Sequence, residues 1–172
     1  RALTKIMSTI LGSYRLPLLI IDQDPKVFNR SVFNARATAI YGFSIFGNNH
    51  TYLLDENNQI DYVALNNFLG KFGNKSFFIF GFTSFVYENL INKLSTKLVK
   101  FNFKNGILVH GGGWKKMEKI KINNKIFKNK LLTKIQLKNV YNYYGLVEQT
   151  GSIFLECEKC SCFVTSIYSD IL

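Results

Sequence analysis

Short β-rich runs that end in glycine or polar residues alternate along this chain with longer stretches whose apolar residues recur at helical spacing. The pattern predicts strands at residues 16–21, 77–82, 107–109, 140–143, 153–157 and 164–168, and helices at residues 31–46, 62–72, 84–94 and 126–137. Parallel strands need long crossover connections, which such helices supply. We therefore predict an α/β fold, a largely parallel sheet flanked by helices, in a single domain that spans residues 1–172.

The composition suits one hydrophobic core. The chain has 172 residues, of which 47% are hydrophobic and 15% aromatic. No apolar run approaches the roughly 20 residues of a membrane-spanning helix, and the first residues lack the pattern of a secretion signal. We expect a cytoplasmic protein without a membrane span. Because Arg1 stands in place of an initiating Met and the sequence stops directly after a strand-like run, we also expect a fragment of a larger enzyme.

The net charge of +11 raises the question of a nucleic-acid partner. Most of the charge comes from lysines that are mixed with asparagine and isoleucine, as in residues 119–130. This distribution is typical of a compositional bias rather than of a binding stripe. We therefore predict no nucleic-acid partner.

Three loops with unusual chemistry follow predicted strands, at residues 81–84, 110–116 and 144–151. In open α/β sheets, ligands bind beyond the carboxyl ends of the strands. The three loops are therefore expected to lie along one edge of the sheet and to form the active site there.

The second loop contains three consecutive glycines, Gly111, Gly112 and Gly113. Glycines let the backbone approach a ligand closely, which suits a flat heterocycle or a phosphate. The alternative is a tight strand-to-helix turn. The neighbours His110, Trp114 and Lys115 supply polar and aromatic groups that a turn does not need, and they favour the ligand. The loop does not match the GxxxxGK[ST] phosphate-binding motif.

In the third loop, Tyr144 offers a ring for stacking, Gly145 clears space beside it, and Glu148 places a carboxylate at the mouth of the site. A metal or an ammonium group would satisfy that carboxylate. Alternatively, Glu148 is an acidic residue at the start of a helix, where the helix dipole favours it.

Other reactive residues carry weaker signals. Nucleophilic catalysis by Thr83 or Ser84 with His110 would require the first two loops to be neighbours, and no GxSxG motif is present. A CxxCxC pattern is formed by Cys157, Cys160 and Cys162. It could bind zinc only with a fourth ligand from elsewhere in the chain, so zinc is not expected. His50 is predicted to be a hydrogen-bonding loop residue rather than a ligand.

The second and third loops, HGGGWKK at residues 110–116 and YGLVEQTG at residues 144–151, resemble the acyl-protein synthetase family. These are the LuxE-type enzymes of bacterial bioluminescence, which belong to the acyl-adenylate-forming superfamily and are related to phenylacetate–coenzyme A ligases. The segment at residues 35–54 is also similar, so the resemblance covers nearly the whole chain. It implies that ATP activates a carboxylic acid, in the luminescence enzymes a long-chain fatty acid, and that the acyl group passes to a protein thiol and then to an acyl-reductase partner.

The resemblance also implies roles for individual residues. Glu148 would bind Mg²⁺ near the α-phosphate and act in catalysis. An acyl pocket would be bordered by Phe82, Thr83, Ser84 and His110. The adenine nucleotide would be bound by Gly111, Gly112, Gly113, Trp114, Tyr144, Gly145 and Thr150.

The family's phosphate-gripping loop is expected upstream of Arg1, and its C-terminal domain and acyl-accepting Cys are expected downstream of Leu172. The isolated chain is therefore expected to be inactive. Two alternatives stay open at this point: a coenzyme A ligase of the same superfamily, and a degenerate adenylation module that binds a partner without catalysis.

Overall fold

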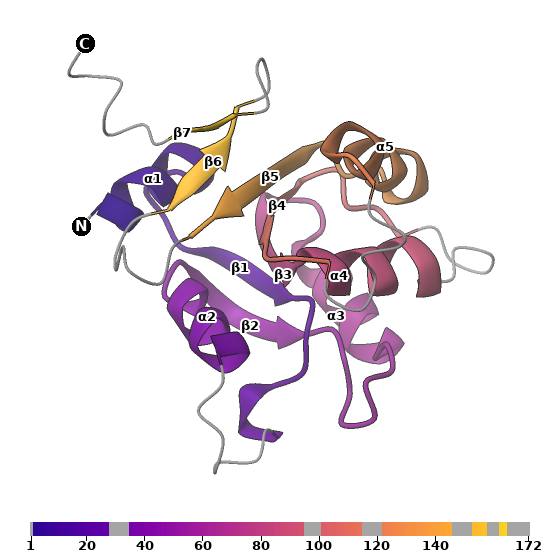
Figure 1. Ribbon diagram of the computed structural model, residues 1–172. Coiled ribbons are helices and arrows are strands. Elements are labelled where there is room, and N and C mark those ends of the chain that lie inside the picture. Colours follow the sequence, from indigo (N-terminus) through magenta and orange to yellow (C-terminus); the bar gives the residue numbers. More distant parts are fainter. Residues whose placement is uncertain are drawn as a thin grey trace.

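The computed structural model describes residues 2–27, 35–94, 101–114, 122–145, 153–157 and 162–164. These residues build a seven-stranded sheet with helices on both faces (Figure 1), which confirms the predicted α/β class. Among the described residues, no helix has the length and apolar character needed to cross a membrane.

The sheet has the strand order β2-β1-β3-β4-β5-β6-β7. In chain order its strands are β1 (Leu16–Ile20), β2 (Gly47–Tyr52), β3 (Phe77–Phe82), β4 (Gly106–Gly111), β5 (Asn139–Tyr144), β6 (Phe154–Glu156) and β7 (Phe163–Val164). Strands β1 to β5 pair in parallel, whereas β6 and β7 are antiparallel. The sheet is therefore largely parallel, as predicted.

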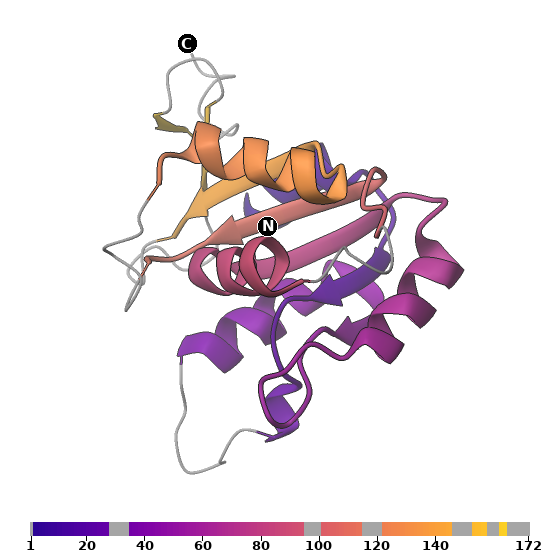
Figure 2. The same cartoon turned by 90° about the vertical axis from the view of Figure 1, so that its right-hand side faces the viewer.

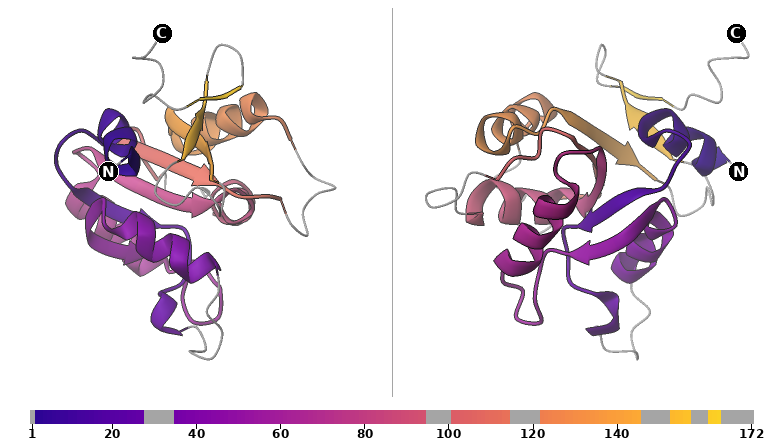
Figure 3. Two further views of the ribbon diagram at one scale, coloured as in Figure 1. Left: turned by 60° about the vertical axis from the view of Figure 1, so that its left-hand side comes forward. Right: turned by 180° about the vertical axis from the view of Figure 1, so that it is seen from behind.

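Helices bury both faces of this sheet. They are α1 (Ala2–Leu11), α2 (Ala35–Ser44), α3 (Tyr62–Phe72), α4 (Thr83–Val86), which continues as the π-helix η2 (Tyr87–Lys93), and α5 (Asn124–Ile135), with a 3₁₀ turn η1 (Pro25–Val27). Helices α1 and α2 lie on one side of the sheet, and α3, α4 and α5 lie on the other (Figures 2 and 3).

Strand β3 shows why two faces are covered. Its side chains alternate, so Phe78 and Phe80 enter the core under α1 and α2, and Phe77 and Ile79 enter the core under α3, η2 and α5. All four are fully buried. A strand that is buried on both sides reads as a continuous apolar run, which is how this segment appears in the sequence.

Polar side chains define where two helices begin. Asp61 accepts a hydrogen bond from the backbone N–H of Ala64 at 2.9 Å at the start of α3, and Asn123 accepts one from Ile126 at 2.8 Å at the start of α5. Helix α5 ends at Ile135 and is followed by the capping residue Gln136, which adopts a left-handed conformation with φ 62°.

Two elements differ from the sequence-based prediction. Strand β2 was not predicted, and the helix after β3 was predicted as a single α-helix. Strand β2 is mostly polar and exposed because it forms an edge of the sheet, so it lacks the apolar run that identified the other strands. His50 lies in this strand rather than in a loop, although its Nε2 atom is within hydrogen-bonding distance of the Ser44 carbonyl, at 3.0 Å. The helix predicted at residues 84–94 begins as α4 and becomes a π-helix from Tyr87.

Candidate active site

The carboxyl ends of the parallel strands meet at one edge of the sheet. The register pairs Phe82 at the end of β3 with Gly111 at the end of β4, and Gly111 with Tyr143 in β5. The residues that follow these strands therefore lie side by side, and the predicted neighbourhood of the three loops is confirmed as far as the structure describes them.

A buried hydrogen bond joins the first two loops. The Nδ1 atom of His110 lies 3.0 Å from the hydroxyl oxygen of Thr83, which is the first residue of α4. His110 is only 2% exposed, and its ring centroid lies 4.6 Å from that of Phe127 in α5, with the two rings tilted by 35°. Burial, together with the nearby charge of Lys128, lowers the pKa of His110 from 6.5 to about 3. The ring is therefore neutral at neutral pH.

The predicted acyl pocket combines this pair with two further residues. Thr83 and Ser84 are buried, and Phe82 is half-buried with its ring at 5.9 Å from that of Phe80. The Nε2 atom of His110 is buried and has no hydrogen-bond partner among the described residues. The structure thus brings Thr83 and His110 together, while their contact with an acyl group stays a prediction.

Glycine is required at two positions of the second loop for structural reasons that do not involve a ligand. A Cβ atom on Gly111 would lie 2.5 Å from the ring of Tyr143 and 2.6 Å from its carbonyl oxygen, and Gly112 has a φ of 80°. The ring of Trp114 turns inward and packs at 5.2 Å from Tyr87 and 6.2 Å from Phe127. Gly112 and Gly113 are exposed. The loop is thus anchored to the core at Trp114 and presents its backbone at the glycines.

Two adjacent tyrosines end β5 in different environments. Tyr143 is packed against Phe43, and burial raises its pKa to about 12. Tyr144 is 49% exposed, with its ring centroid 5.8 Å from that of Phe163. Gly145, directly after it, is also exposed. Tyr144 therefore presents an aromatic ring to solvent at the carboxyl edge of the sheet, and its stacking on a nucleotide stays a prediction.

Several predicted residues lie outside the described part of the chain, namely Glu148, Thr150 and Cys160. The backbone N–H of Cys157 donates to the carbonyl of Cys162 at 2.7 Å. Cys157 is a free thiol, whereas Cys162 is disulfide-bonded. Within the described residues, no group of three or more His, Cys, Asp or Glu side chains could hold a metal ion.

The sequence reading missed an ion pair at the same edge. Asp22 follows β1 and is only 1% exposed, and it pairs with Arg36 in the first turn of α2. The guanidinium carbon of Arg36 lies 4.2 Å from the ring centroid of Phe85 in α4. A charged residue directly after a buried strand is a signal that could have identified Asp22, whereas nothing local distinguishes Arg36.

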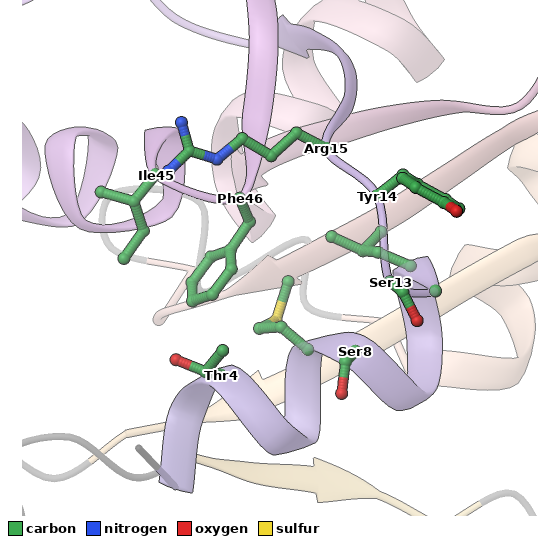
Figure 4. Close-up of a pocket in the computed structure, with 10 residues that line it drawn as sticks. Thr4, Ser8, Ser13, Tyr14, Arg15, Ile45 and Phe46 are labelled. Carbon is green, nitrogen blue, oxygen red and sulfur yellow. The ribbon is translucent and has the colours of Figure 1, made fainter.

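A surface hollow of about 270 Å³ lies at the opposite, amino end of the sheet. Figure 4 shows it between α1, the segment that leads into β1 and the turn from α2 to β2, with Tyr14, Arg15 and Phe46 at its wall. It is thus separate from the loops at the carboxyl edge.

Comparison with known protein families gave a match over nearly the whole chain. The family model described as "Acyl-protein synthetase, LuxE" matches residues 1–171. Searches of the curated proteins and of the solved structures found no match.

Proposed function

Because the chain belongs to the acyl-protein synthetase (LuxE) family, whose activity is acyl activation and transfer, we propose that the full-length protein uses ATP to convert a carboxylic acid to an acyl-adenylate. The acyl group then passes to a protein thiol, and the acid is a long-chain fatty acid. The observation that carries this proposal is the family match over residues 1–171.

The reaction has two steps. A carboxylate oxygen attacks the α-phosphorus of ATP, the bond to the β-phosphate oxygen breaks, and pyrophosphate leaves. A thiolate then attacks the acyl carbon, the bond to the AMP oxygen breaks, and a thioester and AMP result. The first step needs the attacking and leaving oxygens in line at the α-phosphorus, and both steps need the reacting groups to be held close together in a site that excludes water.

Within this proposal, Tyr144 stacks on adenine, and the exposed backbone of Gly112 and Gly113 runs along the nucleotide. The proposal is supported by the exposed ring of Tyr144 at the end of β5, one strand away from the glycine loop. The buried ring of Trp114 holds that loop against the core instead of stacking itself. Gly145 clears space for the nucleotide, and Thr150 binds it.

Glu148 is the residue that we propose to hold Mg²⁺. A bound Mg²⁺ would neutralise charge on the phosphates. The carboxylic acid substrate lies beside Thr83 and Ser84, and Phe82 and His110 also line its pocket. Because burial keeps His110 neutral, we assign it to shaping the pocket and holding Thr83 rather than to proton transfer.

The test is acid-dependent ATP–pyrophosphate exchange by the full-length protein across fatty, aryl and hydroxy acids. Exchange is expected with fatty acids and should be lost in Glu148→Ala. Tyr144→Ala is expected to raise the KM for ATP about tenfold, because stacking of a base on an aromatic ring contributes about 1–3 kcal/mol. The matched control is Tyr14→Ala, which removes a ring that is 86% exposed at the opposite end of the sheet.

Absence of exchange with every acid would contradict the proposal and favour a non-catalytic module. Exchange that leads to acyl–coenzyme A but to no acylated protein would assign the acceptor to coenzyme A instead.

A further inference from the structure

Thr83 and His110 form an isolated polar pair at the carboxyl ends of β3 and β4. The Oγ1 atom of Thr83 lies 3.0 Å from the Nδ1 atom of His110, and the two residues are only 6% and 2% exposed. Within the residues that the structure describes, neither side chain makes another hydrogen bond. The two groups are therefore joined to each other and to no third polar group of the described chain.

The pair carries one more hydrogen than its single hydrogen bond uses. Burial and the charge of Lys128 hold the pKa of His110 at about 3, so the ring is neutral and has one N–H. The hydroxyl of Thr83 adds one O–H. Only one of these two hydrogens lies between the residues, so either the Nε2–H or the Thr83 O–H has no acceptor in the pair. Buried donors are almost always satisfied, and this surplus donor points to an acceptor that a ligand supplies.

The surroundings select the hydroxyl of Thr83 as the donor that meets the ligand. The Nε2 atom of His110 is enclosed, and the ring centroid lies 4.6 Å from that of Phe127, so a ligand does not reach that nitrogen. Thr83 is the first residue of α4, directly after the end of β3, and it retains some exposed surface. When the imidazole proton is on Nδ1, His110 donates to Oγ1 and the Thr83 O–H is free for a ligand.

The position of Thr83 fits an acid whose carboxylate lies between an apolar wall and the glycine loop. Phe82 precedes Thr83 and is half-buried, and it pairs in register with Gly111 of β4. The ring of Phe82 would lie 3.2 Å from a Cβ atom on Gly112, so this wall and the glycine loop are in contact. A group that accepts from Thr83 therefore lies next to both the proposed acyl pocket and the loop proposed to run along the nucleotide.

We propose that the hydroxyl of Thr83 donates a hydrogen bond to a carboxylate oxygen of the acid, and that His110 is a positioning residue that directs this hydroxyl by donating Nδ1–H to Oγ1. The inference rests on the proposed function, since it names the group that binds the acid substrate of that reaction. The bonded oxygen is the one that stays on the acyl carbon, because the other oxygen attacks the α-phosphorus. The contact thus orients the acid as well as binding it.

The first experiment measures ATP–pyrophosphate exchange by the full-length protein with the acid that the wild type uses best. Thr83→Val keeps the branched shape of the side chain and removes the hydroxyl. It is expected to raise the KM for the acid about 10- to 100-fold and to leave the KM for ATP unchanged, as for the loss of a hydrogen bond to a charged group. Thr83→Ser keeps the hydroxyl and should retain most of the affinity for the acid. Thr133→Val, which removes an exposed hydroxyl from α5, is the matched control.

The role of His110 is tested by combining two substitutions. His110→Asn is expected to raise the KM for the acid in the wild-type background and to have no further effect on it in Thr83→Val, because His110 acts through the hydroxyl. Equal effects in the two backgrounds would mean that His110 supports the structure only. A KM does not depend on the fraction of enzyme that is folded, so partial unfolding of a variant lowers the rate without imitating the expected result.

Nuclear magnetic resonance of the ring nitrogens gives a second readout on the wild-type protein. In ¹⁵N-labelled full-length protein with saturating acid, the ring of His110 should carry its proton on Nδ1, and loss of the signals in His110→Asn identifies them. A proton on Nε2 would mean that Thr83 donates to His110 and has no hydrogen left for the acid. That result overturns the inference.

The kinetic outcomes separate this inference from the proposed function. If the wild type shows no exchange with any acid, the proposed function itself fails. If the wild type exchanges and Thr83→Val keeps the wild-type KM for the acid, the hydroxyl of Thr83 does not bind the carboxylate. A rise in the KM for ATP instead would assign the hydroxyl to the nucleotide, and an equal loss of acid affinity in Thr83→Ser would assign the effect to packing; either result overturns the inference.

Discussion

His110 makes the stability of this protein depend on pH in a way that can be calculated. In the folded chain the pKa of His110 is about 3, because burial and then the charge of Lys128 disfavour its protonated form. In the unfolded chain the imidazole returns to its ordinary pKa of 6.5. Between these two values the unfolded state binds a proton that the folded state excludes, so protons favour unfolding.

The magnitude follows from the difference between the two pKa values. One pKa unit corresponds to about 1.4 kcal/mol, so the His110 contribution to the free energy of unfolding is present above pH 6.5 and falls by up to that amount per pH unit below it. Lowering the pH from about 7.5 to about 5 should remove about 2 kcal/mol. The contribution continues to fall until the pH approaches the folded pKa of about 3.

Urea unfolding at a series of pH values measures this loss. Trp114 is the only tryptophan in the chain, and it packs on Phe127, the ring that also contacts His110, so its fluorescence reports the unfolding of this region. Carboxylates titrate in the same range, and His110→Asn separates their effect from that of the imidazole. The His110→Asn variant should be less stable than the wild type at neutral pH. On acidification from about pH 7.5 to about pH 5, its free energy of unfolding should fall by about 2 kcal/mol less than that of the wild type.

His50→Asn is the control, because it leaves His110 and its contribution in place. If wild type and His110→Asn lost the same free energy of unfolding between about pH 7.5 and about pH 5, the buried and neutral state of His110 would be refuted.

Two further predictions concern the scaffold. Gly111→Ala should lower the free energy of unfolding by about 1–3 kcal/mol or more, because the new Cβ would lie 2.5 Å from the ring of Tyr143. Its control is Gly42→Ala in helix α2, where a Cβ would meet nothing within 4 Å and should stabilise the protein by about 0.5–1 kcal/mol. Similar effects of the two variants in urea unfolding would argue against the close packing of Gly111 on Tyr143. Asp61→Ala should lower the melting temperature, because it removes the N-terminal cap of α3, which contributes about 1 kcal/mol. Glu56→Ala, at an exposed position, is the control and should leave the melting temperature unchanged. An unchanged melting temperature in Asp61→Ala would mean that the cap contributes nothing to stability.

Much of the fold could be predicted from local pattern. The run at Phe77–Phe82 is apolar at nearly every position because both faces of β3 are buried, and the helices at Tyr62–Phe72 and Asn124–Ile135 show apolar residues at helical spacing. Strand β2 could not be predicted in this way, because an edge strand exposes polar side chains and carries no apolar run.

The position of the candidate loops at one edge of the sheet could be predicted from the sequence, whereas the contacts of their side chains could not. The sequence by itself determined that three loops follow parallel strands, and parallel strands end at one edge whatever the side chains do. Only the tertiary structure decided that the ring of Trp114 turns into the core while that of Tyr144 faces solvent.

The same distinction applies to the charged and titratable groups. Their residue types are visible in the chain, but Thr83 meets His110 across 27 residues and Asp22 meets Arg36 across 14, through the pairing of strands and the packing of helices. Periodicity reports which side of an element is buried, whereas a hydrogen bond or an ion pair depends on which elements become neighbours in space. For that reason the sequence determined the class of fold and the edge of the sheet at which the candidate loops lie, and the packing decided which of their side chains are in contact.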